Sequence, residues 1–170
     1  MKAVEQIDLW CYEREALQAG YTAVCGCDEA GAGPLAGPVY AAAVILPAGL
    51  EVPGLTDSKK LSEKKREMLF PLIKERAAAW AVASVDAAEI DRIDILNARM
   101  KAMQLAIDAL PVTADFALID GNRDHGSQYA IQTAHRTIVK GDSLSASIAA
   151  ASILAKVSRD HRMMELAETY

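Results

Sequence analysis

The chain has 170 residues, 52% of them hydrophobic, and a formal net charge of −5. This length and apolar content predict a single domain over residues 1–170 with one core, and they argue against intrinsic disorder. The acidic balance argues against a protein that binds polyanions through bulk positive charge, although acids that bind divalent cations can create a site that attracts phosphate.

The three cysteines are odd in number and lack the spacing of a metal site. They indicate a reducing cytoplasm rather than a disulfide framework. Cys25 and Cys27 flank one glycine in an apolar run and are expected to be buried. The first residues do not resemble a secretory leader, and no apolar run approaches the ~18 residues that cross a bilayer. We therefore expect a cytoplasmic monomer without a membrane partner.

Apolar periodicity and turn residues predict the order of the elements. In chain order we expect a helix over 3–19, a strand over 21–28, a turn over 31–38, a strand over 39–47, a loop over 48–60, a helix over 61–79, a strand over 80–87, a helix over 95–110, strands over 115–122 and 135–142, and a long helix over 143–169. Gly20 should end the first helix. Ser62 should cap the second helix, which Pro71 should bend or interrupt.

These elements predict an α/β fold. The first two strands, joined by a short turn, suggest an antiparallel pair, and the later strands alternate with helices. The result should be a mixed five-stranded sheet covered by helices. Methionines at helical spacing in 95–110 are expected in the core. The small residues of 146–157 should let the last helix lie close against the sheet.

Acidic residues follow apolar strands at three places. Asp28 and Glu29 end the first strand, and Asp120 ends the run FALID. Asp142 lies between the last strand and the last helix. Taken singly, each has an ordinary explanation as a cap, a turn residue or a solvated loop residue. Taken together, such acids would repel one another at close range unless a cation lay among them.

The chemistry of these side chains indicates which cation they would bind. Carboxylates without suitably spaced histidine or cysteine favour Mg²⁺ or Mn²⁺ over zinc. Two such ions, roughly 3.5–4 Å apart, are a standard arrangement for phosphodiester hydrolysis. Neighbouring strand residues point to opposite faces, so Asp28 and Glu29 can share a site only if the backbone departs from regular pleating. The glycines from Gly31 onward would permit that departure.

Four segments match one known family in its own order. They are DEAGAGPLAGPV at 28–39, DSKKLSEKKRE at 57–67, LIDGN at 118–122 and VKGDSLSASIAAASILAKVSRD at 139–160. On these segments the sequence resembles a bacterial ribonuclease HII, which is a type 2 ribonuclease H. The resemblance implies a ribonuclease H-like fold with helices on both faces of the sheet. It also implies that the four acids Asp28, Glu29, Asp120 and Asp142 are catalytic ligands of Mg²⁺ or Mn²⁺.

The same resemblance implies a substrate. The family hydrolyses RNA hybridised to DNA and incises duplex DNA at single ribonucleotides, leaving 3′-hydroxyl and 5′-phosphate ends. In the family the turn that matches Gly31, Ala32 and Gly33 presents backbone groups to the ribose 2′-hydroxyl, the group that distinguishes RNA from DNA.

Further positions match family residues next to the nucleic acid. They are Ser58, Lys59, Lys60 and Asn97. Without the resemblance, the two lysines would be interpreted as solvated side chains and the asparagine as a polar residue that caps its helix.

Two departures from the family qualify this expectation. The turn is normally Gly-Arg-Gly, and alanine at position 32 removes a guanidinium that could reach a phosphate, which should weaken binding roughly tenfold or more. The chain also stops at Tyr170, before the family's His-Lys-Gly-Tyr segment. We therefore expect a C-terminally shortened catalytic domain with reduced activity. The alternatives are a hybrid-binding variant that no longer cuts and a related nuclease that acts on DNA branches or ends.

Overall fold

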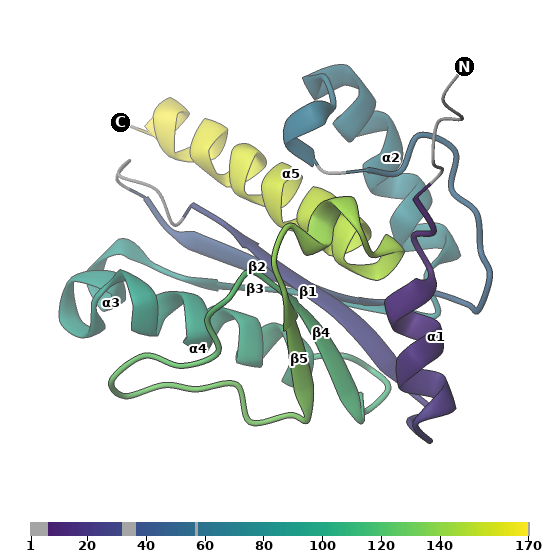
Figure 1. Cartoon of the computed structure of the whole chain (residues 1–170). Coiled ribbons are helices and arrows are strands. Elements are labelled where there is room, and N and C mark those ends of the chain that lie inside the picture. The colour runs from purple at the N-terminus through teal and green to yellow at the C-terminus, as the bar shows by residue number, and fades with distance from the viewer. Residues whose placement is uncertain (1–6, 32–36, 57, 170) are drawn as a thin grey trace, which may run out of the picture.

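The computed structural model describes residues 7–31, 37–56 and 58–169, and a five-stranded sheet in the order β3-β2-β1-β4-β5 lies at its centre (Figure 1). The strands are β1 (Val24–Ala30), β2 (Val39–Ile45), β3 (Ala79–Val85), β4 (Phe116–Asp120) and β5 (His135–Ile138). β1 pairs antiparallel with β2, and β2 with β3. β4 lies parallel to both β1 and β5. The predicted mixed sheet is confirmed.

Within the described ranges the chain forms five α-helices. They are α1 (Cys11–Gln18), α2 (Glu63–Arg76), α3 (Ala87–Ile93), α4 (Ile95–Asp108) and α5 (Ala146–Thr169). The expected cap on α2 is confirmed, because the Ser62 side chain accepts a hydrogen bond from Lys65 N at 3.2 Å. The expected interruption at Pro71 is wrong, since α2 continues through it. The short helix α3, capped by Asp86, was not predicted.

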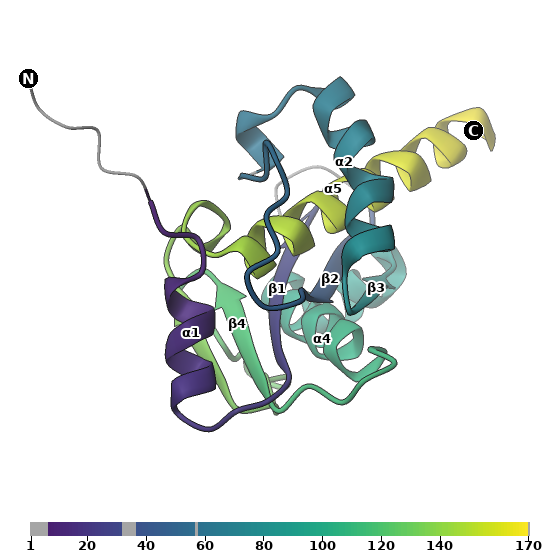
Figure 2. The same cartoon turned by 90° about the vertical axis from the view of Figure 1, so that its right-hand side faces the viewer.

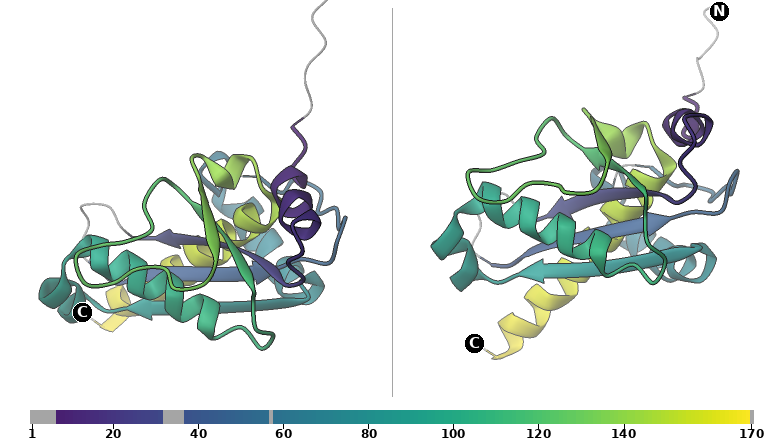
Figure 3. Two further views of the ribbon diagram at one scale, coloured as in Figure 1. Left: turned by 60° about the horizontal axis from the view of Figure 1, so that its bottom comes forward. Right: turned by 90° about the horizontal axis from the view of Figure 1, so that it is seen from below.

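Helices cover both faces of the sheet (Figures 1 and 3). One face packs against α5, with α2 beside it, through Ala42 and Val44 of β2 and the alanines of α5. The other face packs against α4 through Cys25 and Cys27 of β1. In the right-hand view of Figure 3, α4 lies in front of the sheet and α5 behind it.

α5 approaches β1 as closely as the small residues predicted. A Cβ placed on Gly26 would lie 2.2 Å from the backbone carbon of Ser147. A side chain at position 26 is therefore incompatible with this spacing, and β1 and the first turn of α5 are in backbone contact.

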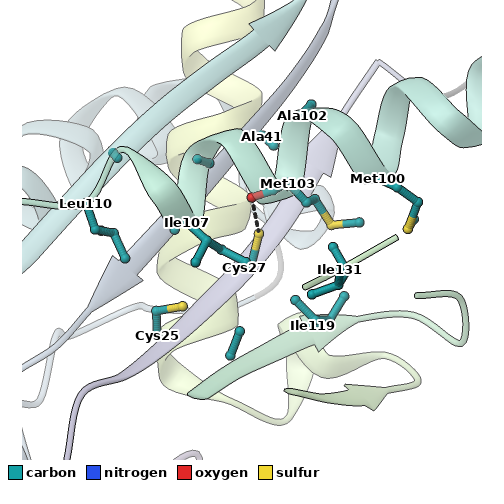
Figure 4. Packing of buried hydrophobic residues seen from close by; sticks show 14 of the residues in the cluster. Cys25, Cys27, Ala41, Met100, Ala102, Met103, Ile107, Leu110, Ile119 and Ile131 are labelled. Carbon is teal, nitrogen blue, oxygen red and sulfur yellow. Dashed lines mark hydrogen bonds between the residues drawn. The ribbon is translucent and has the colours of Figure 1, made fainter. Parts of the chain in front are cut away.

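Two cysteines of β1 and two methionines of α4 are buried as expected (Figure 4). Cys25 and Cys27 are 0% exposed, and Met100 and Met103 are at most 1% exposed. Burial raises the pKa of the Cys25 thiol to about 12, which keeps it protonated and unreactive. Among the described residues, no helix combines the length and apolar content needed to cross a membrane.

Candidate metal centre

Three of the predicted acids meet at one edge of the sheet. Asp28 lies near the end of β1, Asp120 is the last residue of β4, and Asp142 lies in the short 3-10 turn Gly141–Ser143 that precedes α5. β1 and β4 are parallel neighbours with Cys27 opposite Ile119, so the next residue of each strand is an acid at the same level. One carboxylate oxygen from each of the three lies within 4.8 Å of the others.

The turn that carries Asp142 is held against β4. The backbone N–H of Asp142 donates to Asp120 Oδ1 at 3.2 Å. Lys140 adopts a left-handed conformation with φ of 56°, and the carbonyl of Gly141 accepts hydrogen bonds from Leu144 N and Ser145 N. This tight turn places Asp142 next to the strand end rather than letting the chain continue straight into α5.

Burial and neighbouring negative charge both act on Asp28. Asp28 is only 6% exposed. Burial raises its pKa well above the usual range, and the carboxylates of Asp120, Glu29 and Asp142 raise it further. A divalent cation would relieve this repulsion. Because the converging donors are all carboxylate oxygens, they fit a hard ion such as Mg²⁺ or Mn²⁺.

Glu29 points elsewhere. β1 keeps its regular pairing with β2 through Asp28, Glu29 and Ala30, so the departure from pleating that would let both acids share one face is not seen. The Glu29 carboxylate instead accepts from Arg99 of α4, at 2.9 Å from both Nε and Nη2. Its role as a metal ligand stays a prediction.

A cavity of about 350 Å³ adjoins the cluster. It is lined by Asp28, Glu29, Ala30, Gly31, Ser58, Lys59, Asp120, Ser152 and Lys156. The hydroxyls of Ser58 and Ser152 lie 2.7 Å apart, and Lys156 donates to Asp160 at 3.0 Å. The cavity is therefore lined by acids, among them Asp28 and Asp120, and by the two lysines Lys59 and Lys156.

Only some of the other residues predicted to contact the substrate line this cavity. Gly31, Ser58 and Lys59 line the cavity, whereas Lys60 is exposed and is not among the lining residues. Ala32 and Gly33 lie outside the described residues. The sequence assigned no role to Ser152 or Lys156, which also line the cavity and lie four residues apart on one face of α5.

Asn97 does not face the cavity. It is 1% exposed, and its side-chain oxygen accepts from the backbone N–H groups of Gln128 and Tyr129 at 2.9 and 3.1 Å. Its nitrogen donates to Ile93 O at 2.8 Å. Asn97 thus anchors the segment between β4 and β5 to α4. Its predicted place next to the nucleic acid stays a prediction.

Solved structures with this fold define the class. The ribonuclease H2 of Pyrococcus horikoshii OT3 matches with a TM-score of 0.74 and 25% identity over 88% of this chain and 77% of that one. The ribonuclease HII of Archaeoglobus fulgidus, solved in a complex with PCNA, matches with a TM-score of 0.69 and 26% identity over 86% of this chain and 76% of that one. The sheet and its helices are those of a ribonuclease H fold.

Sequence comparison narrows the class further. The family model for ribonuclease HII matches residues 25–170. The ribonuclease HII of Shouchella clausii is 53% identical over 162 residues, which are 95% of this chain and 61% of that protein. That of Geobacter metallireducens is 55% identical over 157 residues, or 92% and 72% of the two chains. The chain belongs to the ribonuclease HII family. It spans less than two thirds of the length of the Shouchella relative.

Proposed function

We propose that this chain is a metal-dependent endonuclease that hydrolyses the RNA strand of RNA/DNA hybrids and incises duplex DNA at embedded ribonucleotides. The convergence of Asp28, Asp120 and Asp142, from three separate segments, beside an open cavity carries the proposal. Membership of the ribonuclease HII family supports the choice of substrate.

The three acids would hold Mg²⁺ or Mn²⁺, with Glu29 as a fourth carboxylate at the same edge. A pair of bound ions supplies an activated water and stabilises the leaving oxygen of the phosphodiester. Burial and the neighbouring acids raise the pKa of Asp28, and a bound cation would favour its ionised form. The backbone contact between Asp142 N and Asp120 Oδ1 keeps two of the ligands in register.

The cavity wall suggests how the substrate is held. Lys59 and Lys156 place positive charge beside the acids, where a phosphate of the scissile strand would lie. Gly31 has φ of +94°, and a Cβ there would lie 2.2 Å from Arg159 Nε and 2.6 Å from the Pro38 carbonyl oxygen, so this position requires glycine. We infer that the turn beginning at Gly31 contacts the ribose 2′-hydroxyl and so selects ribonucleotides.

A cleavage assay tests the proposal. The chain is incubated with Mg²⁺ or Mn²⁺ and three duplexes: an RNA/DNA hybrid, a DNA duplex with one ribonucleotide, and an all-DNA duplex. We expect products with 3′-hydroxyl ends from the first two duplexes only, and none with Asp142→Asn. Salt-sensitive binding without products would instead support the hybrid-binding variant.

A further inference from the structure

A buried glutamate outside the carboxylate cluster has no part in the mechanism above. Glu13 of α1 is 2% exposed, and its neighbour Glu15 on the same helix is largely exposed and pairs with Arg136. A glutamate in an amphipathic helix is normally solvated, because burying a carboxylate costs free energy. The burial of Glu13 therefore calls for partners that stabilise it.

Those partners belong to the start of α5. Glu13 Oε2 accepts hydrogen bonds from Ser145 Oγ at 3.1 Å, from Ser147 N at 3.1 Å and from Ser147 Oγ at 3.0 Å. The carboxylate thus lies at the positive end of the helix dipole. In Figure 2, α1 runs beside the beginning of α5.

Residues in and just before α1 accept hydrogen bonds from two backbone N–H groups at the start of α5. The first N–H groups of a helix have no partner within the helix itself. Here Ala146 N donates to the Leu9 carbonyl at 2.8 Å, Ser147 N donates to Glu13, and Ile148 N donates to Ser145 Oγ at 3.2 Å. Two of the three N–H groups are therefore satisfied by residues far away in the sequence.

This anchored helix start adjoins the carboxylate cluster in two ways. Ser145 N donates to the Gly141 carbonyl at 2.8 Å, so the residue that precedes α5 is tied to the turn that carries Asp142. Ser147 is also the residue whose backbone touches Gly26, which lies two positions before Asp28 on β1. A shift of this first turn would move Asp142 relative to Asp28.

We propose that Glu13 is a positioning residue for the metal centre: it fixes the first turn of α5 and thereby keeps Asp142 within reach of Asp28 and Asp120. This inference rests on the proposed function in one respect, that the three acids bind a divalent cation. Glu13 Oε1 is buried and has no hydrogen-bond partner among the described residues. Burial raises the pKa of Glu13 above its usual value, in keeping with a carboxylate that is costly to bury.

The test measures Mn²⁺ affinity directly, by titration calorimetry or by the loss of the free-ion electron paramagnetic resonance signal, in the intact chain without nucleic acid. Glu13→Ala should weaken Mn²⁺ binding by about tenfold or more, the size of effect seen when the support of a metal ligand is removed. Glu13→Gln keeps an oxygen acceptor and should recover part of that loss. The matched control Glu15→Gln, two residues away on α1, should bind as the wild type does.

The melting temperature separates positioning from simple stability. If Glu13→Ala melts earlier but binds Mn²⁺ with unchanged affinity below its transition, Glu13 serves folding only and the inference is wrong. Should that variant not fold, Ser147→Ala removes one donor to the same carboxylate, and unchanged Mn²⁺ affinity in it would also overturn the inference. A wild-type chain that binds no Mn²⁺ would refute the metal centre itself, and the positioning role with it.

Discussion

The Glu29 carboxylate accepts two contacts of 2.9 Å from the Arg99 guanidinium, on the face of β1 opposite to that of Asp28. The two adjacent acids therefore have different surroundings. Asp28 belongs to the carboxylate cluster, and Glu29 pairs with Arg99 of α4. Both still border the same cavity. Arg99 therefore competes with any cation that binds there for the charge of Glu29.

Replacement of Arg99 should tighten ion binding. Arg99→Met removes a positive charge near the cluster, and we expect Mg²⁺ affinity to rise roughly threefold to tenfold, since such a charge is worth on the order of 1 kcal/mol in a partly solvated site. Calorimetric titration measures the change. Arg92→Met, at the exposed pair with Glu89, is the control and should leave affinity unaltered. Weaker binding by the Arg99 variant would contradict this account of Glu29.

Asp28 should lower the stability of the metal-free protein. The pKa of Asp28 is raised in the folded state, so the folded protein holds this proton more tightly than the unfolded chain does. The free energy of unfolding is therefore highest below the ordinary aspartate pKa of about 4, and it falls as pH rises toward the folded-state pKa. With a chelator present, Asp28→Asn should melt above the wild type at pH 8, and the difference should shrink toward pH 4. Each kcal/mol corresponds to roughly 2–4 °C in a chain of this size. The same variant should lose cleavage activity by roughly a hundredfold or more.

Thermal scans and cleavage assays across this pH range check both halves of that prediction. Asp91→Asn, at an exposed position of α3, is the control and should follow the wild-type curve. Equal pH dependence in the wild type and in Asp28→Asn would show that Asp28 does not carry the effect.

Mg²⁺ or Mn²⁺ should stabilise the folded chain by mass action. At a free ion concentration of 100 times Kd, the gain is about 2.7 kcal/mol, and a chelator should reverse it. Asp142→Asn removes one of the three converging ligands and should show little or no rise in Tm. The measurement is a melting curve at increasing ion concentration. A similar rise in Asp142→Asn would place the bound ion elsewhere.

Gly26→Ala should disrupt both the packing of α5 and the cluster. The new Cβ would meet backbone atoms of Ser147 and Ile148 at 2.2–2.3 Å, and these cannot move as a flexible side chain can. We expect a loss of about 1–3 kcal/mol or more in the free energy of unfolding, together with weaker Mn²⁺ binding. Denaturant titration measures the first effect. Gly54→Ala, with open space around it, should cost only about 1 kcal/mol from its backbone conformation.

Arginine at position 32 should improve incision at single ribonucleotides. A charged hydrogen bond to phosphate is worth about 1.5–3 kcal/mol, so Ala32→Arg should raise the incision rate at subsaturating substrate roughly tenfold or more. Ala32→Lys supplies charge without the planar fork and should give a smaller gain. The measurement is the incision rate on a duplex with one ribonucleotide. An unchanged rate in Ala32→Arg would contradict the prediction that arginine at this position contacts a phosphate.

The sequence was most informative where local pattern and chemistry agree. Apolar runs located all five strands to within a few residues. The three aspartates that follow or end these strands lie close together, which is the situation in which the sequence argument called for a cation. The buried cysteines were evident from their apolar surroundings. Ser62 was identifiable because its cap forms within four residues of chain.

Features that depend on distant partners were not predictable. Glu13 has the spacing of a solvated helix residue, and only the approach of Ser145 and Ser147 explains its burial. The pairing of Glu29 with Arg99 depends on how α4 crosses β1. α3 is short, and its cap at Asp86 resembles an ordinary turn residue in the sequence.

The parallel pairing of β1 with β4 has a consequence for how the protein folds. β2, α2, β3, α3 and α4 all lie between these two strands in the chain, so their pairing closes a long loop and requires entropy to be lost before contacts compensate for it. Asp28 and Asp120 come together only when this closure is complete. A nascent or partly folded chain therefore has separated acids, and under the proposed function metal binding would report that the native topology has formed.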